Sequence, residues 1–443
     1  MRASRRSLGA AALAASILVA TARPLRAQDS SSGYGRVSLF LEGGSASPFD
    51  GGASRSFNDA WASLAMRSGV GDKGSAFEYA LEGRGRSTSA GDERENRFQL
   101  YDAWVGGRVA EGVLGARVGQ MWLNELGALG AVGGLLLEVR PKGDWKAGRV
   151  RFGLFGGLDP KTWEAGYYDG VKKGGAYAVL EGANARRHVV GWVLVKNGSL
   201  TERSVVSVSN FVPAGRKLFV YQAAEYDLSG PGGQGTGGLS YLFANARWSV
   251  STRVEVQGTY HHGRSVDTRT ITQDELDGRP IDPKRLEGLL FETVGGRLAV
   301  EPVRGVRVWA GWARDRYNKD EAPGNRYSAG LYAGNVLKSR IDLNAIATRN
   351  DRPTGAYDSW YVSLGRSFGS ALYLSVDYST AASVIRTTGT GGIVVETRPS
   401  SRRYTLNGLV NLTRDLSLQV TVERLTDDVE AATRGSAGLT YRF

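Results

Sequence analysis

The sequence predicts an all-β chain: a transmembrane barrel of about 22 antiparallel strands (range about 18–22) that run up and down in chain order. Three observations support this prediction. Segments of about ten residues alternate apolar and polar side chains from Tyr34 onward, short and long links alternate between the segments, and an export signal precedes them. We expect residues 28–443 to form one barrel domain.

Residues 1–27 have the pattern of a secretory signal peptide. Arginines open it, residues 8–22 form an apolar run rich in alanine and leucine, and small residues up to Ala27 suit cleavage there. The run is shorter than the roughly 20 residues of a helical span, so an N-terminal anchor is the less favoured alternative. No later stretch reaches that length without charge. An exported chain of this kind is therefore either soluble or a barrel.

The alternation of side chains is clearest in four segments. They are Val250–Tyr260, Ile341–Ala347, Leu372–Tyr378 and Leu416–Val422. Each has one apolar and one polar parity, which is the period of a β-strand. In a soluble sandwich the apolar face would form a core, whereas in a membrane barrel it would meet lipid and the polar face would line the lumen. The local pattern leaves both structures open.

The links between the segments favour the barrel. Short turns such as Ala110–Gly112 and Arg304–Gly305 alternate with longer links such as Ser265–Leu290 and Ala382–Arg402. This parity is typical of an up-and-down meander with tight turns at one end, and a Greek-key sandwich would not keep it. The first long link is expected to hold a helical turn and the second a hairpin that extends beyond the membrane. Residues 123–175 are the hardest part to divide into strands.

The last residues, Ser436–Phe443, form the strand by which the barrel would close. Its apolar parity is Ala437, Leu439, Tyr441 and Phe443, and the chain ends on the aromatic residue. This ending resembles the C-terminal signature of bacterial outer-membrane β-barrels. In that family the terminal aromatic strand is read by the barrel-assembly machinery. The resemblance therefore implies that Tyr441 and Phe443 are the assembly signal.

Residues 98–141 carry a second resemblance, to a strand pair of Gram-negative porins. Phe98–Arg108 and Leu114–Trp122 are similar to an A-[YW]-V strand followed by a strand that ends in a G-R-Q-like motif. In porins a loop then folds into the pore, and a strand with a D-G-L-like motif follows. The resemblance implies that Asn124–Val132 is the loop that enters the lumen, with an ordinary outer loop as the alternative.

This chain departs from the porin pattern at two positions. Gln120 stands where the family's arginine would follow Gly119, and Gly133 replaces the aspartate. The departures put in doubt the part that these two positions would play in a porin pore.

The polar parity of the strands supplies the residues expected to line the lumen. They are Arg253, Glu255, Gln257, Arg307, Asp342, Asp377, Gln419, Glu423 and Arg442. Facing charges of this kind would sort solutes by sign and size. The alternative for each residue is that it only solvates a wet wall or pairs across strands.

Charge and composition narrow the partners. Residues 1–27 hold five arginines and no acid, so their removal lowers the net charge from +12 to +7. This modest excess suits anionic solutes or lipopolysaccharide phosphates and is no nucleic-acid footprint. The chain has 61 glycines, 12 prolines and no cysteine, which excludes thiolate metal sites. We expect no metal and no other cofactor.

The sequence predicts a porin-like channel of the bacterial outer membrane, for passive diffusion of small hydrophilic solutes with a slight bias toward anions. Its expected partners are outer-membrane lipid and lipopolysaccharide, the barrel-assembly machinery and the solutes, and the resemblance allows a homotrimer. One alternative is a barrel that exports or docks a polymer such as an exopolysaccharide, which a wide lumen without a constriction loop would favour. Another is a purely structural barrel.

We do not expect an enzyme. The three histidines are His188, His261 and His262, and strand parity places His261 inward and His262 outward, so this pair cannot share a metal from one strand. No H-x-x-x-H motif occurs. An outer-membrane enzyme is the least favoured alternative and would need His261 beside an acid or a serine.

Overall fold

A computed structural model describes residues 33–68, 77–90, 93–143, 148–230, 236–388 and 394–443. The predicted signal peptide, residues 1–27, lies outside this part of the chain. The strands are β1 (Tyr34–Pro48), β2 (Arg55–Arg67), β3 (Glu78–Ala90), β4 (Glu93–Val109), β5 (Leu114–Trp122), β6 (Ala131–Val139), β7 (Arg149–Pro160), β8 (Tyr167–Glu181), β9 (Arg187–Asn197), β10 (Leu200–Ala214), β11 (Leu218–Ser229), β12 (Thr236–Ser249), β13 (Val254–Ser265), β14 (Leu289–Val303), β15 (Val306–Tyr317), β16 (Gly324–Ala333), β17 (Ile341–Arg352), β18 (Gly355–Phe368), β19 (Leu372–Thr388), β20 (Val394–Thr397), β21 (Ser400–Asn411), β22 (Leu416–Asp427) and β23 (Glu430–Arg442).

The helices are few and short. They are the 3-10 helices η1 (Asn124–Gly130), η2 (Ala183–Ala185) and η4 (Val336–Lys338), and the α-helices α2 (Thr268–Leu276) and α3 (Pro283–Glu287). No helix in the described ranges is long and apolar enough to cross a membrane.

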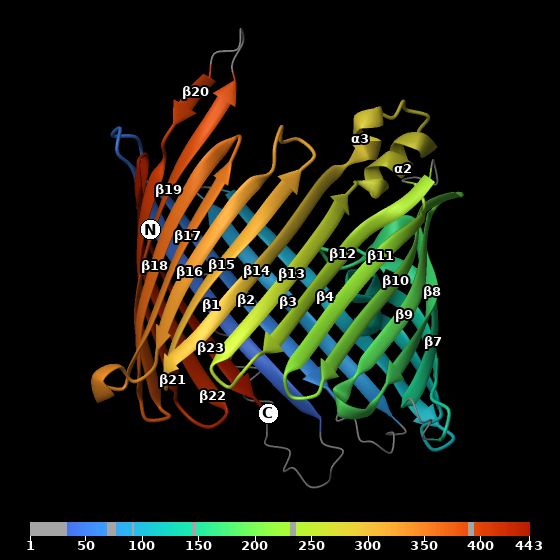
Figure 1. The fold of residues 1–443 in the computed structure, drawn as a ribbon. Helices are drawn as coiled ribbons and strands as arrows, with labels where there is room; N and C mark the ends of the chain where they lie inside the picture. The colour runs from blue at the N-terminus through green and yellow to red at the C-terminus, as the bar shows by residue number, and fades with distance from the viewer. Residues whose placement is uncertain (1–32, 69–76, 91–92, 144–147, 231–235, 389–393) are drawn as a thin grey trace, which may run out of the picture.

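The strands close into one antiparallel barrel (Figure 1). Each strand pairs with the next along the chain, and β1 pairs with β23 from Arg36 opposite Arg442 to Pro48 opposite Glu430. The sheet has 23 strands by hydrogen bonding, but β20 and β21 both pair with β19, so the wall has 22 positions. The predicted up-and-down barrel is therefore confirmed, with the predicted strand count.

The seam between the first and last strands is fully hydrogen-bonded up to the final residue. The Gly35 amide donates to the Phe443 carbonyl at 2.7 Å, and the Phe443 amide donates to the Gly35 carbonyl at 3.0 Å. The Phe443 ring occupies the space that a side chain at position 35 would need. Glycine at this position lets the terminal ring lie against the first strand.

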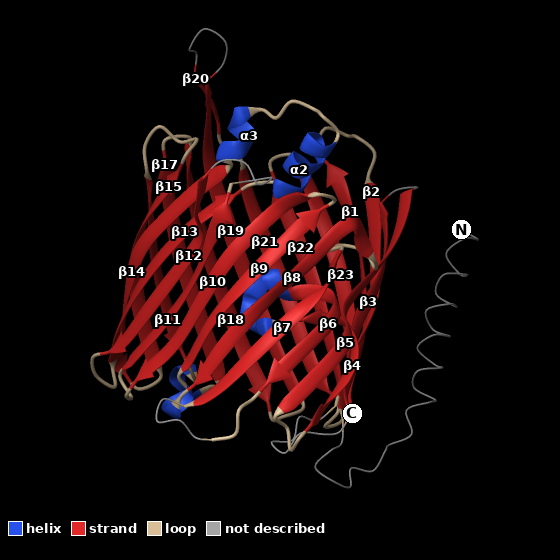
Figure 2. Ribbon diagram, turned by 90° about the vertical axis from the view of Figure 1, so that its right-hand side faces the viewer, coloured by secondary structure: helices blue, strands red, loops and turns tan. Residues whose placement is uncertain are grey.

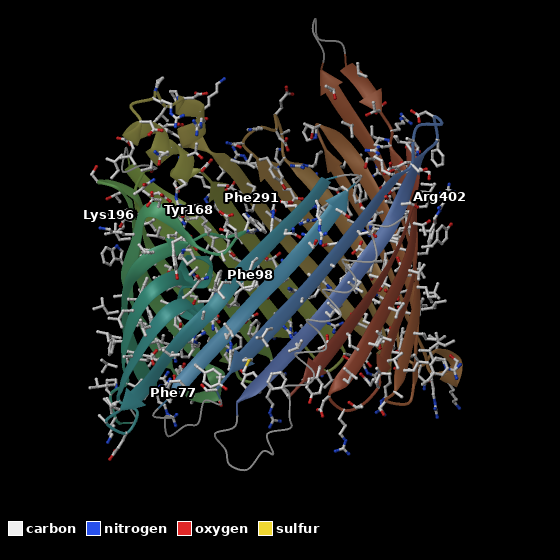
Figure 3. The ribbon with its side chains drawn as sticks, turned by 180° about the vertical axis from the view of Figure 1, so that it is seen from behind. Phe77, Phe98, Tyr168, Lys196, Phe291 and Arg402 are labelled. Atoms are coloured by element: carbon white, nitrogen blue, oxygen red, sulfur yellow. The ribbon has the colours of Figure 1, made fainter. Side chains whose placement is uncertain are left out.

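The outer face of the barrel is an uncovered apolar surface. On it Val376 is 57% exposed, and Val420 and Leu439 are each 40% exposed, because no element among the described residues packs over them. The outer-face cations Lys196 and Arg402 both lie toward one end of the barrel (Figure 3). A continuous apolar face of this size is typical of contact with lipid, so the barrel spans a membrane.

The links divide between two ends, as predicted. The short turns lie at the end where β1 begins and β23 finishes, which we call the terminal rim. The other end, the opposite rim, carries α2, α3 and the hairpin of β19 and β20 above the wall (Figure 1). The expected helical turn and extended hairpin are both confirmed.

Two details of the strand prediction were wrong. The outer link predicted at Ala382–Arg402 is shorter, because β19 runs on to Thr388 and β21 already begins at Ser400. The segment Val250–Tyr260 is also not one strand, because β13 begins at Val254. The Ser251 hydroxyl accepts hydrogen bonds from the amides of Arg253 and Val254 at 3.2 and 3.1 Å and forms a turn there.

The two faces of β22 give a direct test of the fold. We expect Val420→Arg, on the outer face, to lower the free energy of unfolding by about 2–4 kcal/mol, because it places a charge in lipid. The neighbouring change Gln419→Arg points into the lumen and should alter it by less than about 0.5 kcal/mol. Denaturant unfolding in lipid vesicles measures both. Equal losses at the two positions would contradict the assignment of the faces.

Candidate functional site

The candidate site is built around the link between β5 and β6, which turns into the barrel. Both strands have 9 residues, whereas β4 has 17, so the wall here stops below the opposite rim. The link forms η1, which lies at mid-height within the barrel (Figure 2). The predicted entry of this loop into the lumen is confirmed for residues 124–130, whereas Ala131 and Val132 already belong to β6.

Apolar packing holds η1 against the inner face of the wall. Leu126 is 3% exposed and belongs to one buried cluster with Val189 and Val193 of β9. The side chain of Leu126 fills the space next to Gly191, where any Cβ atom would overlap it. Because η1 covers them, strands β8 and β9 carry apolar residues on both faces. The same cluster buries Val132 and Leu136 of β6, Phe155 of β7 and Val171 of β8. Apolar inner faces in these strands explain why residues 123–175 did not show a clean alternation.

Ion pairs fix the same helix at its first turn. Glu125 accepts a hydrogen bond from Arg151 at 2.8 Å and another from Arg187 at 3.2 Å. Arg151 also donates to Glu138 at 2.9 Å, and the Tyr177 hydroxyl donates to Glu138 at 3.0 Å. The side chains of Glu125 and Glu138 are only 11% and 6% exposed. Removing one partner would leave a buried charge uncompensated, so the network resists outward movement of the loop.

The gap in the wall above β5 and β6 is closed by the link between β7 and β8. The Ala165 amide donates to the Phe98 carbonyl of β4 at 2.6 Å. Gln120 donates to the Leu100 carbonyl, and the ring of Tyr167 lies over Gly133. The two departures from the porin pattern, Gln120 and Gly133, therefore serve this closure. A charge at position 120 or a side chain at position 133 would not fit it.

A chamber of about 610 Å³ lies between η1 and the facing wall of the lumen. Its floor includes Asn124, Glu125 and Leu126 of η1, and its wall is formed by residues of β10 to β14. Val266 and Thr268, at the start of the α2 insert, complete the lining on the side of the opposite rim. A volume of this order is usual for a small-molecule site.

The α2 helix is tied down beside the chamber by one arginine. Arg269 donates to Glu202 of β10 at 2.6 Å and to Asp159 of β7 at 2.7 Å, and its guanidinium lies 4.0 Å from the centre of the Tyr168 ring. Ile271 is fully buried against the rim. The insert is therefore docked on the ends of the strands rather than free in solvent.

The arginines that line the chamber already have hydrogen-bond partners. Arg203 donates to Asp227 at 2.7 Å and to Glu225 at 3.0 Å, on the neighbouring strand β11. Arg264 donates to the main-chain carbonyls of Leu286 and Glu287 at 2.8 and 3.0 Å. The chamber thus presents acceptor oxygens, and both of its described lining arginines already have hydrogen-bond partners.

One wall of the lumen is aromatic. Following the pairing across strands, Tyr241 lies opposite Gly263, Gly263 opposite Phe291, and Phe291 opposite Tyr317. The His261 ring centre is 4.6 Å from that of Phe291. This wall was not predictable from residue order alone, because the face on which an aromatic residue lies depends on strand register.

The residues predicted to line the lumen do not gather at this chamber. Glu255, Gln257, Arg307, Asp342, Asp377, Gln419, Glu423 and Arg442 lie in β13, β15, β17, β19, β22 and β23 at positions of the inner parity, and Arg253 lies in a turn of the terminal rim.

Several of these residues pair across strands. Arg307 donates to Glu255 at 2.6 Å, and Arg434 donates to Glu423 at 2.7 Å. Asn407 donates to Asp377, also at 2.6 Å. None of the nine lines the chamber. Any effect of these residues on selectivity remains a prediction.

The two adjacent histidines face opposite sides, as predicted. His261 packs among the aromatic rings of the lumen wall, whereas His262 lies 3.3 Å from Glu292 on the outer face. His188 hydrogen-bonds to Asn210 at 2.8 Å. No cluster of metal-ligating side chains occurs in the described part of the chain. The arrangement thus offers a binding chamber in a lumen.

Comparison with known proteins gives likenesses of fold. No family model and no curated protein sequence matches the chain. Among solved structures it is similar to the P pilus usher (PapC) translocation pore, at 12% identity and a TM-score of 0.49, over 92% of this chain and 99% of that chain. It is also similar to Pseudomonas aeruginosa OpdQ (9% identity, TM-score 0.44, covering 93% and 99%) and to Acinetobacter baumannii OccAB4 (8% identity, TM-score 0.43, covering 94% and 99%). The barrel and its inward loop define the chain, by its own geometry, as a transmembrane β-barrel with a narrowed lumen.

Truncating the apolar anchor of η1 should loosen the loop. We expect Leu126→Ala to lower the free energy of local opening of residues 124–130 by about 2–5 kcal/mol, because it leaves a cavity beside Gly191. Amide hydrogen exchange measures this opening. Leu137→Ala on the outer face is the matched control and should leave exchange in the loop unchanged. Unaltered exchange in Leu126→Ala would show that the loop is not held by this contact.

The start of α2 should loosen in acid. Asp267 caps this helix, accepting a hydrogen bond from the Thr270 amide at 3.1 Å, and hydrogen bonds from Thr270 hold the pKa of Asp267 below its usual range. A depressed pKa means that the cap contributes stability above the unfolded-state pKa and loses it as pH falls through the folded-state value.

We therefore expect hydrogen-exchange protection of residues 268–276 to drop below about pH 4. Asp267→Asn keeps an acceptor that does not titrate and should remove this pH dependence. An identical pH profile in Asp267→Asn would assign the acid effect to another group.

Proposed function

We propose that this chain is a passive channel of the bacterial outer membrane for small hydrophilic solutes. The observation that supports it most is the unequal filling of the lumen. The single inward element in the described residues, η1, packs on the wall around β8 and β9, whereas the inner faces of β16 to β23 have no covering element. Side chains alone do not fill a barrel of 22 strands, so water should fill the remaining space.

The inner faces of these later strands suit a wet pathway. Ser363 lies opposite Asp377 on β18 and β19, and Thr421 lies opposite Ser436 on β22 and β23. Small hydroxyl and carboxylate side chains of this kind are stable in water and leave space between them. They would be poor packing partners for a plug.

We further propose a slight preference for anions. Arg297 lies 4.2 Å from the centre of the Trp309 ring and Arg84 lies 5.8 Å from that of Trp61, and neither forms an ion pair with a described residue. Arg36 and Arg442 lie opposite each other at the seam near the terminal rim. These arginines would give the lumen a positive potential that the paired charges do not cancel.

The proposal includes the cellular setting predicted from sequence. Residues 1–27 would direct export, Tyr441 and Phe443 would be read by the barrel-assembly machinery, and outer-face cations such as Lys196 and Arg402 would contact lipopolysaccharide phosphates. Export of a polymer is less well supported, because η1 narrows the lumen and is held there by buried ion pairs. The terminal rim would face the periplasm.

Planar-bilayer recording tests the channel. We expect stepwise conductance from the refolded barrel and a reversal potential in a salt gradient that favours anions. The double change Arg84→Gln with Arg297→Gln should lower the anion-to-cation permeability ratio roughly 2-fold, since it removes two unpaired lumen cations. Arg349→Gln, paired with Asp358 on the outer face, is the control and should not change it. A correctly folded barrel that stays silent would refute the channel.

A further inference from the structure

The aromatic wall of the chamber is the feature that the proposed channel leaves unexplained. Ring centres along it are 5.9 Å apart for Tyr221 and Phe243, 5.5 Å for Tyr241 and His261, 4.6 Å for His261 and Phe291, and 6.4 Å for Phe291 and Tyr317. The rings come from five consecutive strands, β11 to β15. They form one continuous apolar strip on the inner face of the barrel.

Structural packing alone does not explain this strip. The other large apolar area of the inner face, on β8 and β9, is covered by η1 and belongs to the buried cluster. Tyr221, Tyr241 and Phe291 instead line the chamber and are only partly buried. Apolar surface left open to a wet lumen is unfavourable, and such patches commonly mark a binding site.

The way in which the rings lie also favours a ligand. The Phe291 ring lies over Gly263, in the space that a side chain would occupy, so one side of it is against the wall and the other is turned to the chamber. The Tyr221 and Tyr241 hydroxyls make no hydrogen bond to the described residues. A flat aromatic surface with hydroxyls at its edge remains available to a solute.

The polar lining facing this strip consists mainly of acceptors. Glu225 and Asp227 each accept from Arg203, and a carboxylate has room for further donors on its remaining lone pairs. Ser207 and Ser209 add hydroxyls to the same lining. The lining holds four carboxylates against two arginines whose hydrogen bonds are already taken up, so it disfavours an anionic solute. The chamber therefore matches a neutral solute that has many hydroxyl donors and one apolar face.

We propose that the chamber binds cyclic sugars as they pass through the channel. The C–H face of a pyranose ring would stack on Phe291 and Tyr241, because its slightly positive hydrogens meet the negative faces of the aromatic rings. Its hydroxyls would donate to Glu225, Asp227 and the serines. The inference rests on the proposed channel for the passage of the sugar, but the binding itself does not require conductance.

The test compares glucose with sorbitol, its open-chain counterpart, which has the hydroxyls but no ring. Saturation-transfer NMR on the detergent-solubilised barrel should show binding of glucose and not of sorbitol. In bilayers, glucose should reduce the ion current in a saturable way. Phe291→Ala should weaken glucose binding about 3- to 10-fold, and Phe291→Leu should weaken it to a similar extent, because a leucine has no aromatic face.

Tyr361→Ala provides the matched control. Tyr361 has the inner parity of β18, opposite Ile346 and Ser379, and does not line the chamber. Its loss should leave glucose binding unchanged. Conductance without glucose binding, or equal binding of glucose and sorbitol, would overturn the sugar site and leave the channel standing. Glucose binding to a silent barrel would support the site and refute the channel.

Discussion

The structure depends on one constraint: in a bilayer, every main-chain donor and acceptor must be paired within the protein. The seam between β1 and β23 meets it, with pairing that runs from Arg36 to Pro48 and two further hydrogen bonds between Gly35 and Phe443. Closure requires that the first and last strands be antiparallel neighbours, which fixes an even strand number and places both chain ends of the wall at one rim. The alternation of side chains follows, because lipid covers one face and the lumen the other.

Closure of so many strands creates an interior that side chains cannot fill. In the described residues, a short inward loop rather than a separate plug domain occupies part of this interior. Leu126 and Glu125 secure η1 by apolar packing and by ion pairs to Arg151 and Arg187. The inner face of β8 and β9 is apolar where the loop packs against it. The facing wall keeps an uncovered aromatic strip, and the chamber between them is where a passing solute would meet the most protein surface.

Much of this fold was predictable from residues alone, since period-two segments such as Leu416–Val422 and the aromatic ending encode which side meets lipid. The inward loop was indicated by the porin-like strands around it. The chamber was not predictable. Its residues come from η1, from strands β10 to β14 and from the α2 insert, and only the strand register brings them together. In the sequence, Glu125 resembles any acidic loop residue. The residues next to Phe291 in the sequence do not show that its ring packs over Gly263, which is 28 residues earlier. The prediction that Arg253 lines the lumen from a strand was wrong, because the turn at Ser251 delays the start of β13 to Val254.

The central claim is that the strands form a closed cylinder with a wet lumen and a lipid-facing exterior. Thiol labelling tests this claim most directly. The chain has no cysteine, so single substitutions report without background. Asn344 and Ala345 are neighbours on β17 and lie on its two faces. In barrels reconstituted in liposomes, a water-soluble maleimide should label Asn344→Cys rapidly and leave Ala345→Cys unlabelled. Rapid labelling of Ala345→Cys, or protection of Asn344→Cys in a folded barrel, would contradict the account.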